Sequence, residues 1–133
     1  MDANLNRARE GLRVCEEVAR LIWGEPALTR RCQALRYAVS RAAALLPREK
    51  LLKARNTQGD VGRPSRRGRQ GVYRNPRHLA AANVKRTQEA LRVLEEFSRW
   101  VAPRASRRFG QLRFGAYSLE RSFDRVRSSV RHR

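Results

Sequence analysis

The chain has few of the residues that build metal centres or catalytic triads. Its 133 residues include only two cysteines, Cys15 and Cys32, and two histidines, His78 and His132. Two cysteines cannot supply a disulfide framework or a four-cysteine zinc site, and two distant histidines do not form a metal cluster or a Ser-His-Asp triad. We therefore expect Cys15 and Cys32 to be buried free thiols, and we assign the histidines no role.

Long apolar runs are also missing. No stretch approaches the roughly 18 apolar residues of a membrane-spanning helix, and the opening Met-Asp-Ala-Asn does not begin a signal peptide. This predicts a cytoplasmic protein with no membrane partner. The two standard nucleotide-binding turns, Gly-x-x-x-x-Gly-Lys-Ser/Thr and Gly-x-Gly-x-x-Gly after a strand, do not occur. Any nucleotide would have to bind a different architecture.

Acidic residues are scarce relative to basic ones. The chain has 12 Asp and Glu against 31 Lys and Arg, which gives a formal net charge of +19. Such a charge attracts polyanions, whether nucleic acid, phosphorylated metabolites or an anionic membrane. Lys occurs only at positions 50, 53 and 85, and so strong a preference for Arg can also reflect genomic base composition. The charge indicates an anionic ligand but not its identity.

The sequence contains an internal repeat. Residues 3–22 (ANLNRAREGLRVCEEVARLI) and 82–101 (ANVKRTQEALRVLEEFSRWV) share ten of twenty residues at an offset of 79. A weaker echo at an offset of 77 relates 33–37 (QALRY) to 110–114 (GQLRF). The duplicated unit is therefore interpreted as two helices, with a two-residue deletion between them in the second copy.

Four segments have apolar residues at helical spacing, and no segment alternates with the period of a strand. The predicted helices end at turn residues: Asp2 as a cap, Gly24-Glu25-Pro26, Pro47, Asn75-Pro76 as an N-cap with proline after it, and Pro103. We predict an all-α fold for the single domain 1–133, a four-helix bundle of two hairpins. Repeat 1 spans about 2–46, a long basic Gly-rich loop about 47–75, and repeat 2 about 76–131.

Two polar residues in each copy fall inside the predicted apolar arc of their helix. They are Asn4 and Arg7 in the first copy and Asn83 and Arg86 in the second. A core-edge arginine needs an anionic partner to offset its desolvation, so the two pairs could converge on one anionic ligand. Alternatively, Arg7 and Arg86 pair with Glu10 and Glu89 and only fix the packing. Arg13, Glu17 and Arg20, with their copies, point outward and are expected to form ordinary surface ion pairs.

The loop between the repeats carries a second candidate site. In Arg55-Asn56-Thr57-Gln58-Gly59-Asp60-Val61-Gly62-Arg63, glycines let backbone amides approach a phosphate, and two arginines can clamp it. Asp60 could hold Mg²⁺. A flexible basic surface loop has the same composition, so both interpretations stay open.

Three segments together resemble one family: residues 2–14 (DANLNRAREGLRV), Asp60-Val61-Gly62, and residues 83–96 (NVKRTQEALRVLEE). It is the small all-α hydroxymethylpyrimidine phosphate kinase family of bacterial thiamine biosynthesis, found alone or fused ahead of thiamine phosphate synthase. The resemblance implies transfer of the ATP γ-phosphoryl group, with Mg²⁺, to 4-amino-5-hydroxymethyl-2-methylpyrimidine phosphate.

The site residues expected for this reaction come from their placement in the sequence. We assign phosphate clamping to Arg7, Arg86, Arg55 and Arg63, Mg²⁺ binding to Asp60 with Glu10 or Glu89, and substrate orientation to Asn4 and Asn83. Two other functions fit the same sequence. One is a helical nucleic-acid-binding domain, and the other is a noncatalytic domain that docks onto thiamine phosphate synthase.

Overall fold

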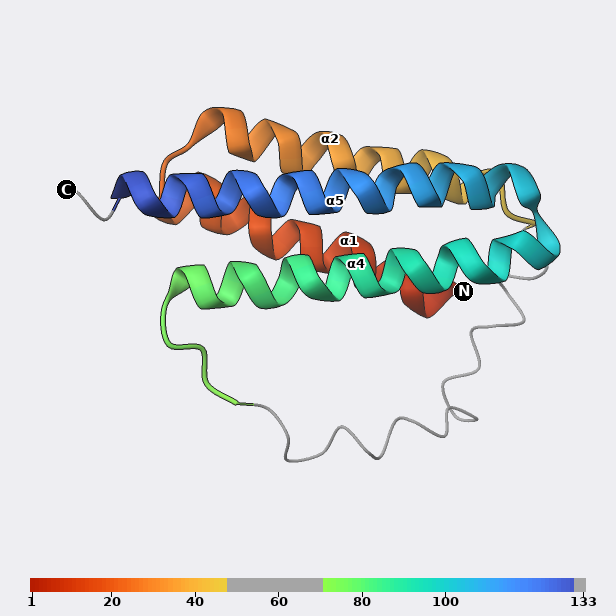
Figure 1. The fold of residues 1–133 in the computed structure, drawn as a ribbon, viewed down its shortest axis with the longest axis horizontal. Helices are drawn as coiled ribbons and strands as arrows, with labels where there is room; N and C mark the ends of the chain where they lie inside the picture. Colours follow the sequence, from red (N-terminus) through yellow and green to blue (C-terminus); the bar gives the residue numbers. More distant parts are fainter. Residues whose placement is uncertain (48–70, 131–133) are drawn as a thin grey trace.

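The computed structural model describes residues 1–47 and 71–130, and all of its regular elements there are helices. Helix α1 spans Asp2–Glu17 and continues as a short π-helix, η1, over Val18–Ile22. Helix α2 spans Pro26–Ala43, α4 spans Pro76–Val101 and α5 spans Pro103–Val130 (Figure 1). The prediction of an all-α protein is confirmed.

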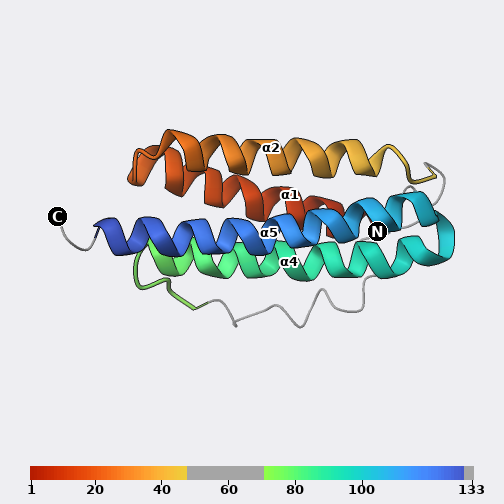
Figure 2. The same ribbon diagram turned by 45° about the horizontal axis from the view of Figure 1, so that its top comes forward.

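The four long helices lie side by side with antiparallel neighbours. The α1–α2 hairpin and the α4–α5 hairpin contact each other through two seams, α1 against α4 and α2 against α5 (Figures 1 and 2). The end of α2 and the start of α4 lie at opposite ends of the molecule. Helices α1 and α4 therefore form one layer and α2 and α5 the other.

The core is built from the apolar stripes that the sequence shows at helical spacing. Leu5, Leu12 and Val18 of the first segment are buried, as are Leu91 and Leu94 of α4. Both cysteines are buried free thiols, as predicted. Each helix covers about one side of this core with its apolar face, which is why the period of 3.6 residues identifies all four helices.

The predicted helix ends are confirmed at one capping position and wrong at another. Asn75 caps α4, since its side-chain oxygen accepts a hydrogen bond from the backbone amide of His78 at 2.8 Å, and Pro76 follows at the first helical position. Asp2 lies inside α1, whose N-cap is Met1 without a side-chain cap bond. Helix α2 ends at Ala43, before Pro47 is reached.

The two hairpin turns differ in length. Three residues, Trp23, Gly24 and Glu25, connect η1 to α2, whereas Ala102 alone connects α4 to α5. Gly24 has a φ of 62°, a left-handed conformation that glycine adopts without strain. The difference of two residues matches the change in offset between the two parts of the sequence repeat.

Within residues 1–47 and 71–130, no helix combines the length and the apolar character needed to cross a membrane.

Candidate functional site

Helices α1 and α4 approach each other closely at Gly11. A Cβ atom at Gly11 would collide with the Thr87 hydroxyl and would lie 2.9 Å from the backbone carbonyl oxygen of Asn83. The Thr87 hydroxyl donates to the carbonyl of Asn83 at 2.9 Å and also lies 3.4 Å from the carbonyl of Ala8. Only a glycine leaves room for this approach of the two backbones.

The first predicted pair lies at the edge of this seam. Arg7 is half-buried, and its guanidinium donates to the side-chain oxygen of Asn4, one turn earlier, at 3.1 Å. Among the described residues no carboxylate forms an ion pair with Arg7. Its charge is therefore oriented by a neutral amide and stays available to an anion.

The second pair is arranged differently, and the predicted placement of Arg86 is wrong. Asn83 is buried, and its amide nitrogen donates to the carbonyl of Leu79 at 2.9 Å. Arg86 is exposed. The apolar arc of α4 is narrower than predicted and ends before Arg86. The long side chain of Arg86 extends from the edge of this arc into solvent, where its charge is hydrated.

Glu10 and Glu89 are exposed. Neither forms an ion pair with Arg7 or Arg86 in the part of the chain that the structure describes, so the alternative of purely structural pairing finds no support there. The described residues also contain no group of three His, Cys, Asp or Glu side chains able to hold a metal ion. Arg55, Asp60 and Arg63 lie outside the described residues.

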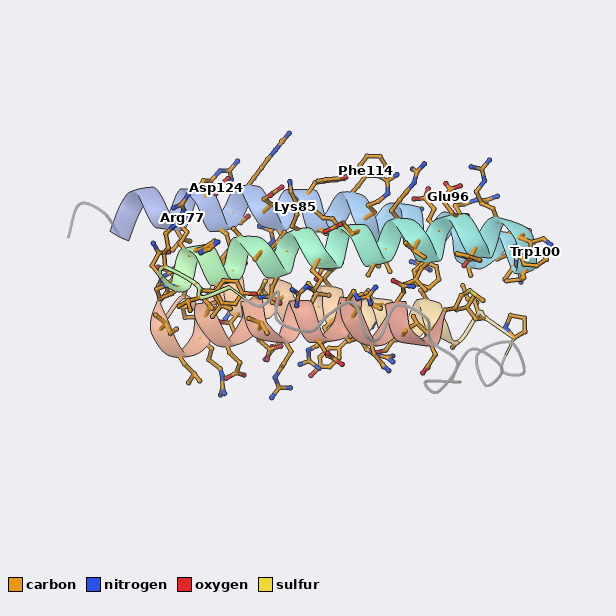
Figure 3. The ribbon with its side chains drawn as sticks, turned by 90° about the horizontal axis from the view of Figure 1, so that it is seen from below. Arg77, Lys85, Glu96, Trp100, Phe114 and Asp124 are labelled. Atoms are coloured by element: carbon orange, nitrogen blue, oxygen red, sulfur yellow. The ribbon has the colours of Figure 1, made fainter. Side chains whose placement is uncertain are left out.

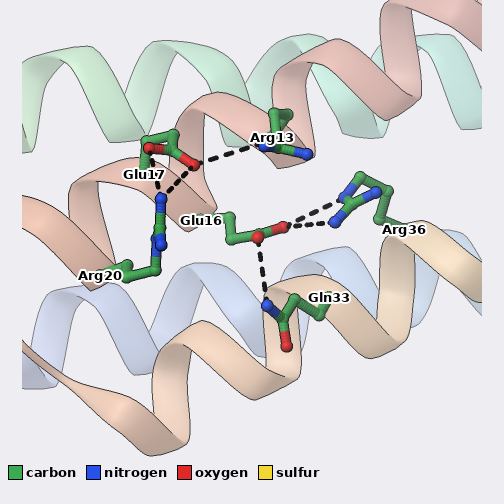
Figure 4. Close-up of polar contacts among 6 residues, drawn as sticks. All are labelled: Arg13, Glu16, Glu17, Arg20, Gln33 and Arg36. Carbon is green, nitrogen blue, oxygen red and sulfur yellow. Dashed lines mark hydrogen bonds and ion pairs between the residues drawn. The ribbon is translucent and has the colours of Figure 1, made fainter.

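A different carboxylate forms the buried ion pair of the first hairpin. Glu16 accepts hydrogen bonds from Arg36 at 2.9 and 3.1 Å and from Gln33 at 3.2 Å (Figure 4). Burial lowers the pKa of Arg36, but the hydrogen bond and the charge of Glu16 outweigh it, so this pKa lies above its ordinary value. This pair joins α1 to α2, and the sequence prediction missed it.

The second hairpin contains the corresponding pair. Arg113 donates to Glu95 at 2.8 Å, and this hydrogen bond raises the pKa of Arg113. Ser106 donates to the backbone carbonyl of Glu95 at 2.8 Å. Both pairs could have been found from the sequence, since Glu16 and Glu95 correspond in the long repeat and Arg36 and Arg113 correspond in the shorter echo.

The predicted surface ion pairs are confirmed. Glu17 lies 3.3 Å from Arg13 and 3.4 Å from Arg20 (Figure 4), and the same spacing recurs on α4, where Glu96 pairs with Arg92 and Arg99. These side chains are largely exposed, so each pair contributes little to stability.

The contacts above account for half of the ten residues that the two segments share. Leu12 and Leu91 fill the core, and Glu16, Glu17 and their counterparts Glu95 and Glu96 form ion pairs. Three shared polar positions remain without such a structural role. They are Asn4 and Asn83, Arg7 and Arg86, and Glu10 and Glu89.

A separate open depression lies beside the first hairpin turn. It is lined by Arg20, Gly24, Glu25, Pro26, Thr29 and Arg30. Arg20 is 13 residues from Arg7, about 20 Å along a helix. The depression is therefore distinct from the residues predicted to bind substrate.

Comparison with known proteins identifies relatives that are longer than this chain. It is 40% identical over 120 residues to a thiamine-phosphate synthase of Synechocystis sp., a match that covers 90% of this chain and 34% of the relative. The synthase of Gloeobacter violaceus is 39% identical over 120 residues, and that of Rhodopirellula baltica is 34% identical over 124.

The chain spans about a third of the length of these relatives, 34% in Gloeobacter violaceus and 33% in Rhodopirellula baltica. No solved structure matches it. The model of the ThiD2 family matches residues 1–122, nearly the whole chain, and the protein belongs to this family.

Proposed function

We propose that this protein is an ATP-dependent kinase of thiamine biosynthesis that converts hydroxymethylpyrimidine phosphate to its pyrophosphate. Membership of the ThiD2 family and relatives named thiamine-phosphate synthase support a role in this pathway. The resemblance of residues 2–14 and 83–96 to the kinase family supports the reaction. The product is the substrate that a thiamine phosphate synthase uses.

The observation that carries the proposal is the set of shared polar residues that neither fill the apolar core nor form ion pairs among the described residues. Asn4, Arg7 and Glu10 lie on α1, and their counterparts lie on α4, the helix packed against it. We infer that the chain is a duplicated four-helix bundle in which a pseudo-twofold axis relates the two sets. Two arginines on adjacent helices suit a reaction between two phosphorylated molecules.

The chemistry requires little from the protein beyond positioning and charge. An oxygen of the substrate phosphate monoester, already ionised at neutral pH, attacks the γ-phosphorus of ATP while the bond to the ADP oxygen breaks. No strong general base is needed. Cationic groups must hold the two polyanions in line and neutralise the charge that develops on the transferred group.

In this proposal the arginines bind phosphate. Arg7 and Arg86 act from the helices, and Arg55 and Arg63 act from the connecting segment. Asn4 orients Arg7 through the hydrogen bond described above. The side chain of Asn83 is held by its hydrogen bond to the backbone carbonyl of Leu79. We therefore expect Asn83 to form part of the wall of the second half of the site.

Mg²⁺ is the proposed cofactor. Glu10 and Glu89 present exposed carboxylates without an ion-pair partner among the described residues, and such oxygen ligands suit Mg²⁺. Mg²⁺ commonly takes one or two carboxylates and completes its shell with water and substrate phosphates, so Asp60 with one of these glutamates would be sufficient. The bound ion would neutralise charge on the phosphates.

The test is a coupled assay with Mg-ATP and hydroxymethylpyrimidine phosphate. Added thiamine phosphate synthase and its thiazole substrate convert the pyrophosphate to thiamine phosphate, which is measured. Arg86→Ala and Asp60→Ala should each lower turnover by about 100-fold or more, as loss of a transition-state contact does. Arg92→Ala is the matched control, since Arg92 is also an exposed arginine of α4 but pairs with Glu96.

Three results would contradict the proposal or its site. Absence of product from folded wild-type protein would remove the kinase. Near-normal turnover in both Arg86→Ala and Asp60→Ala would remove the site, as would equal losses in Arg86→Ala and Arg92→Ala. A protein without activity that forms a stable complex with the synthase would instead support the noncatalytic partner function.

A further inference from the structure

The two helix layers differ in charge. Helix α2 contains no Asp or Glu, and α5 contains none before Glu120. The α1–α4 layer, by contrast, carries the glutamates that form the surface ion pairs with Arg13, Arg20 and their copies. The positive charge of the described residues is therefore least compensated over α2 and the first half of α5.

Two adjacent arginines recur at the same place on both of these helices. Arg30 and Arg31 follow the start of α2 at Pro26 by four and five residues, and Arg107 and Arg108 follow the start of α5 at Pro103 in the same way. All four are exposed, and none pairs with a carboxylate among the described residues. Arg31 contacts the hydroxyls of Ser118 and Ser122 on α5. For the other three arginines, no packing contact in the described part of the chain explains why the pair recurs.

The antiparallel packing separates the two arginine pairs along the molecule. Arg31 lies level with Ser118 and Ser122 on α5, which are 10 and 14 residues beyond Arg108. At a rise of 1.5 Å per residue, Arg31 and Arg108 are roughly 15–20 Å apart along the helix axis. A single phosphate group cannot reach both, but a chain of phosphates can.

Exposed aromatic rings accompany the arginines. Tyr37 of α2 is 52% exposed, and Phe114 and Tyr117 of α5 are 66% and 40% exposed. Arg36 lies over the Tyr37 ring at 4.8 Å, and Arg113 over Phe114 at 5.2 Å. Figure 3 shows Phe114 pointing outward from α5. Rings and guanidinium planes of this kind stack with unpaired bases.

We propose that the outer face of α2 and α5 binds single-stranded nucleic acid. We call this surface, with Arg30, Arg31, Arg107 and Arg108, the basic face. The arginines contact successive phosphates, and the rings on the same helices stack with bases. The proposal does not rest on the kinase activity, which uses residues of α1, α4 and the connecting segment.

The experiment measures the affinity of the protein for a labelled 12-nucleotide oligouridine RNA by fluorescence anisotropy across a salt series. Arg107→Gln/Arg108→Gln removes two charges from the basic face, and Arg13→Gln/Arg92→Gln removes two from ion pairs of the other layer. Both variants start from the same net charge of +19. Circular dichroism checks that both are folded, and Arg30→Gln/Arg107→Gln replaces the first variant if it unfolds.

We expect the basic-face variant to lose about tenfold in affinity. The slope of log K against log salt concentration should become less steep by about 1.4, because two phosphate contacts are lost and each contact to a single strand contributes roughly 0.7. The control variant should lose less than about twofold with an unchanged slope. Phe114→Ala should weaken binding by a factor of about five or more if the ring stacks on a base.

Equal losses in the two charge variants would overturn the proposal, because binding would then follow net charge alone. Polyglutamate peptide and vesicles containing anionic lipid serve as competing ligands. Binding of either with the same loss in the basic-face variant would also overturn the assignment to nucleic acid. Thiamine phosphate formation is measured on the same samples and should not change in the basic-face variant. The coupled assay therefore tests the kinase proposal, and the RNA titration tests the binding proposal independently.

Discussion

Replacing Gly11 by alanine tests the close approach of α1 and α4. The added Cβ would meet the Thr87 hydroxyl and the carbonyl oxygen of Asn83, the latter at 2.9 Å. The hydroxyl belongs to a side chain that can rotate, but the carbonyl belongs to the backbone of α4. Relief of the collision therefore requires the two helices to move apart.

The expected cost follows from two opposing effects. Overpacking of a tight core contact costs about 1–3 kcal/mol. Replacing glycine by alanine inside a helix stabilises the helix by up to about 1 kcal/mol. We expect Gly11→Ala to lower the free energy of unfolding by about 1–2 kcal/mol, and the midpoint of urea unfolding by roughly 0.5–1 M.

The assay is equilibrium unfolding in urea followed by circular dichroism. Gly115→Ala is the matched control, because its Cβ would meet only the flexible end of Leu35, at 3.3 Å, and should leave stability unchanged or slightly higher. Adding Thr87→Ala to Gly11→Ala should restore part of the loss. If Gly11→Ala is as stable as the wild type, the helices do not approach as described.

Three further outcomes are expected. Glu16→Gln should cost more stability than Glu95→Gln, about 2 against 1 kcal/mol in urea unfolding, because Glu16 is 5% exposed against 20% and accepts more hydrogen bonds. Arg13→Ala should change stability by less than about 0.5 kcal/mol in the same assay, since its ion pair is exposed. Burial raises the pKa of Cys32 to about 12 and that of Cys15 further. Because the folded protein holds these thiols protonated, their contribution to the free energy of unfolding is complete below the unfolded pKa of 9.0 and decreases as the pH rises above it. From pH 9 to 10 the loss should be about 1 kcal/mol per thiol, and it should vanish in Cys15→Ala/Cys32→Ala, a result that urea unfolding at each pH measures.

The sequence predicts the helices well because each buries one apolar face. Leu5, Leu12 and Leu91 lie at the spacing that brings one side of a helix to the core, and all three are buried. The end of α2 was less predictable. Apolar spacing continues to Leu46, which is buried although the helix ends at Ala43, because burial does not require helical backbone.

The candidate site was predictable only in part. A helical projection places Arg7 and Arg86 at the same angle, yet one is half-buried and the other exposed. A long side chain at the edge of the apolar arc can turn either way, and which way depends on its neighbours. The ion pair of Glu16 with Arg36 depends on contact between two helices, which the periodicity of one helix cannot reveal.

The close contact at Gly11 also bears on how the two hairpins recognise each other. In the sequence repeat, Gly11 corresponds to Ala90 and Thr87 corresponds to Ala8. Two copies of the second hairpin, packed in the same way, would place Ala90 against Thr87, where there is no room for a Cβ. Two copies of the first hairpin would place Gly11 against Ala8, which leaves the space of the Thr87 side chain empty. The seam therefore favours pairing of the first hairpin with the second. Two copies of either hairpin expressed alone would pack less well than the two different hairpins do.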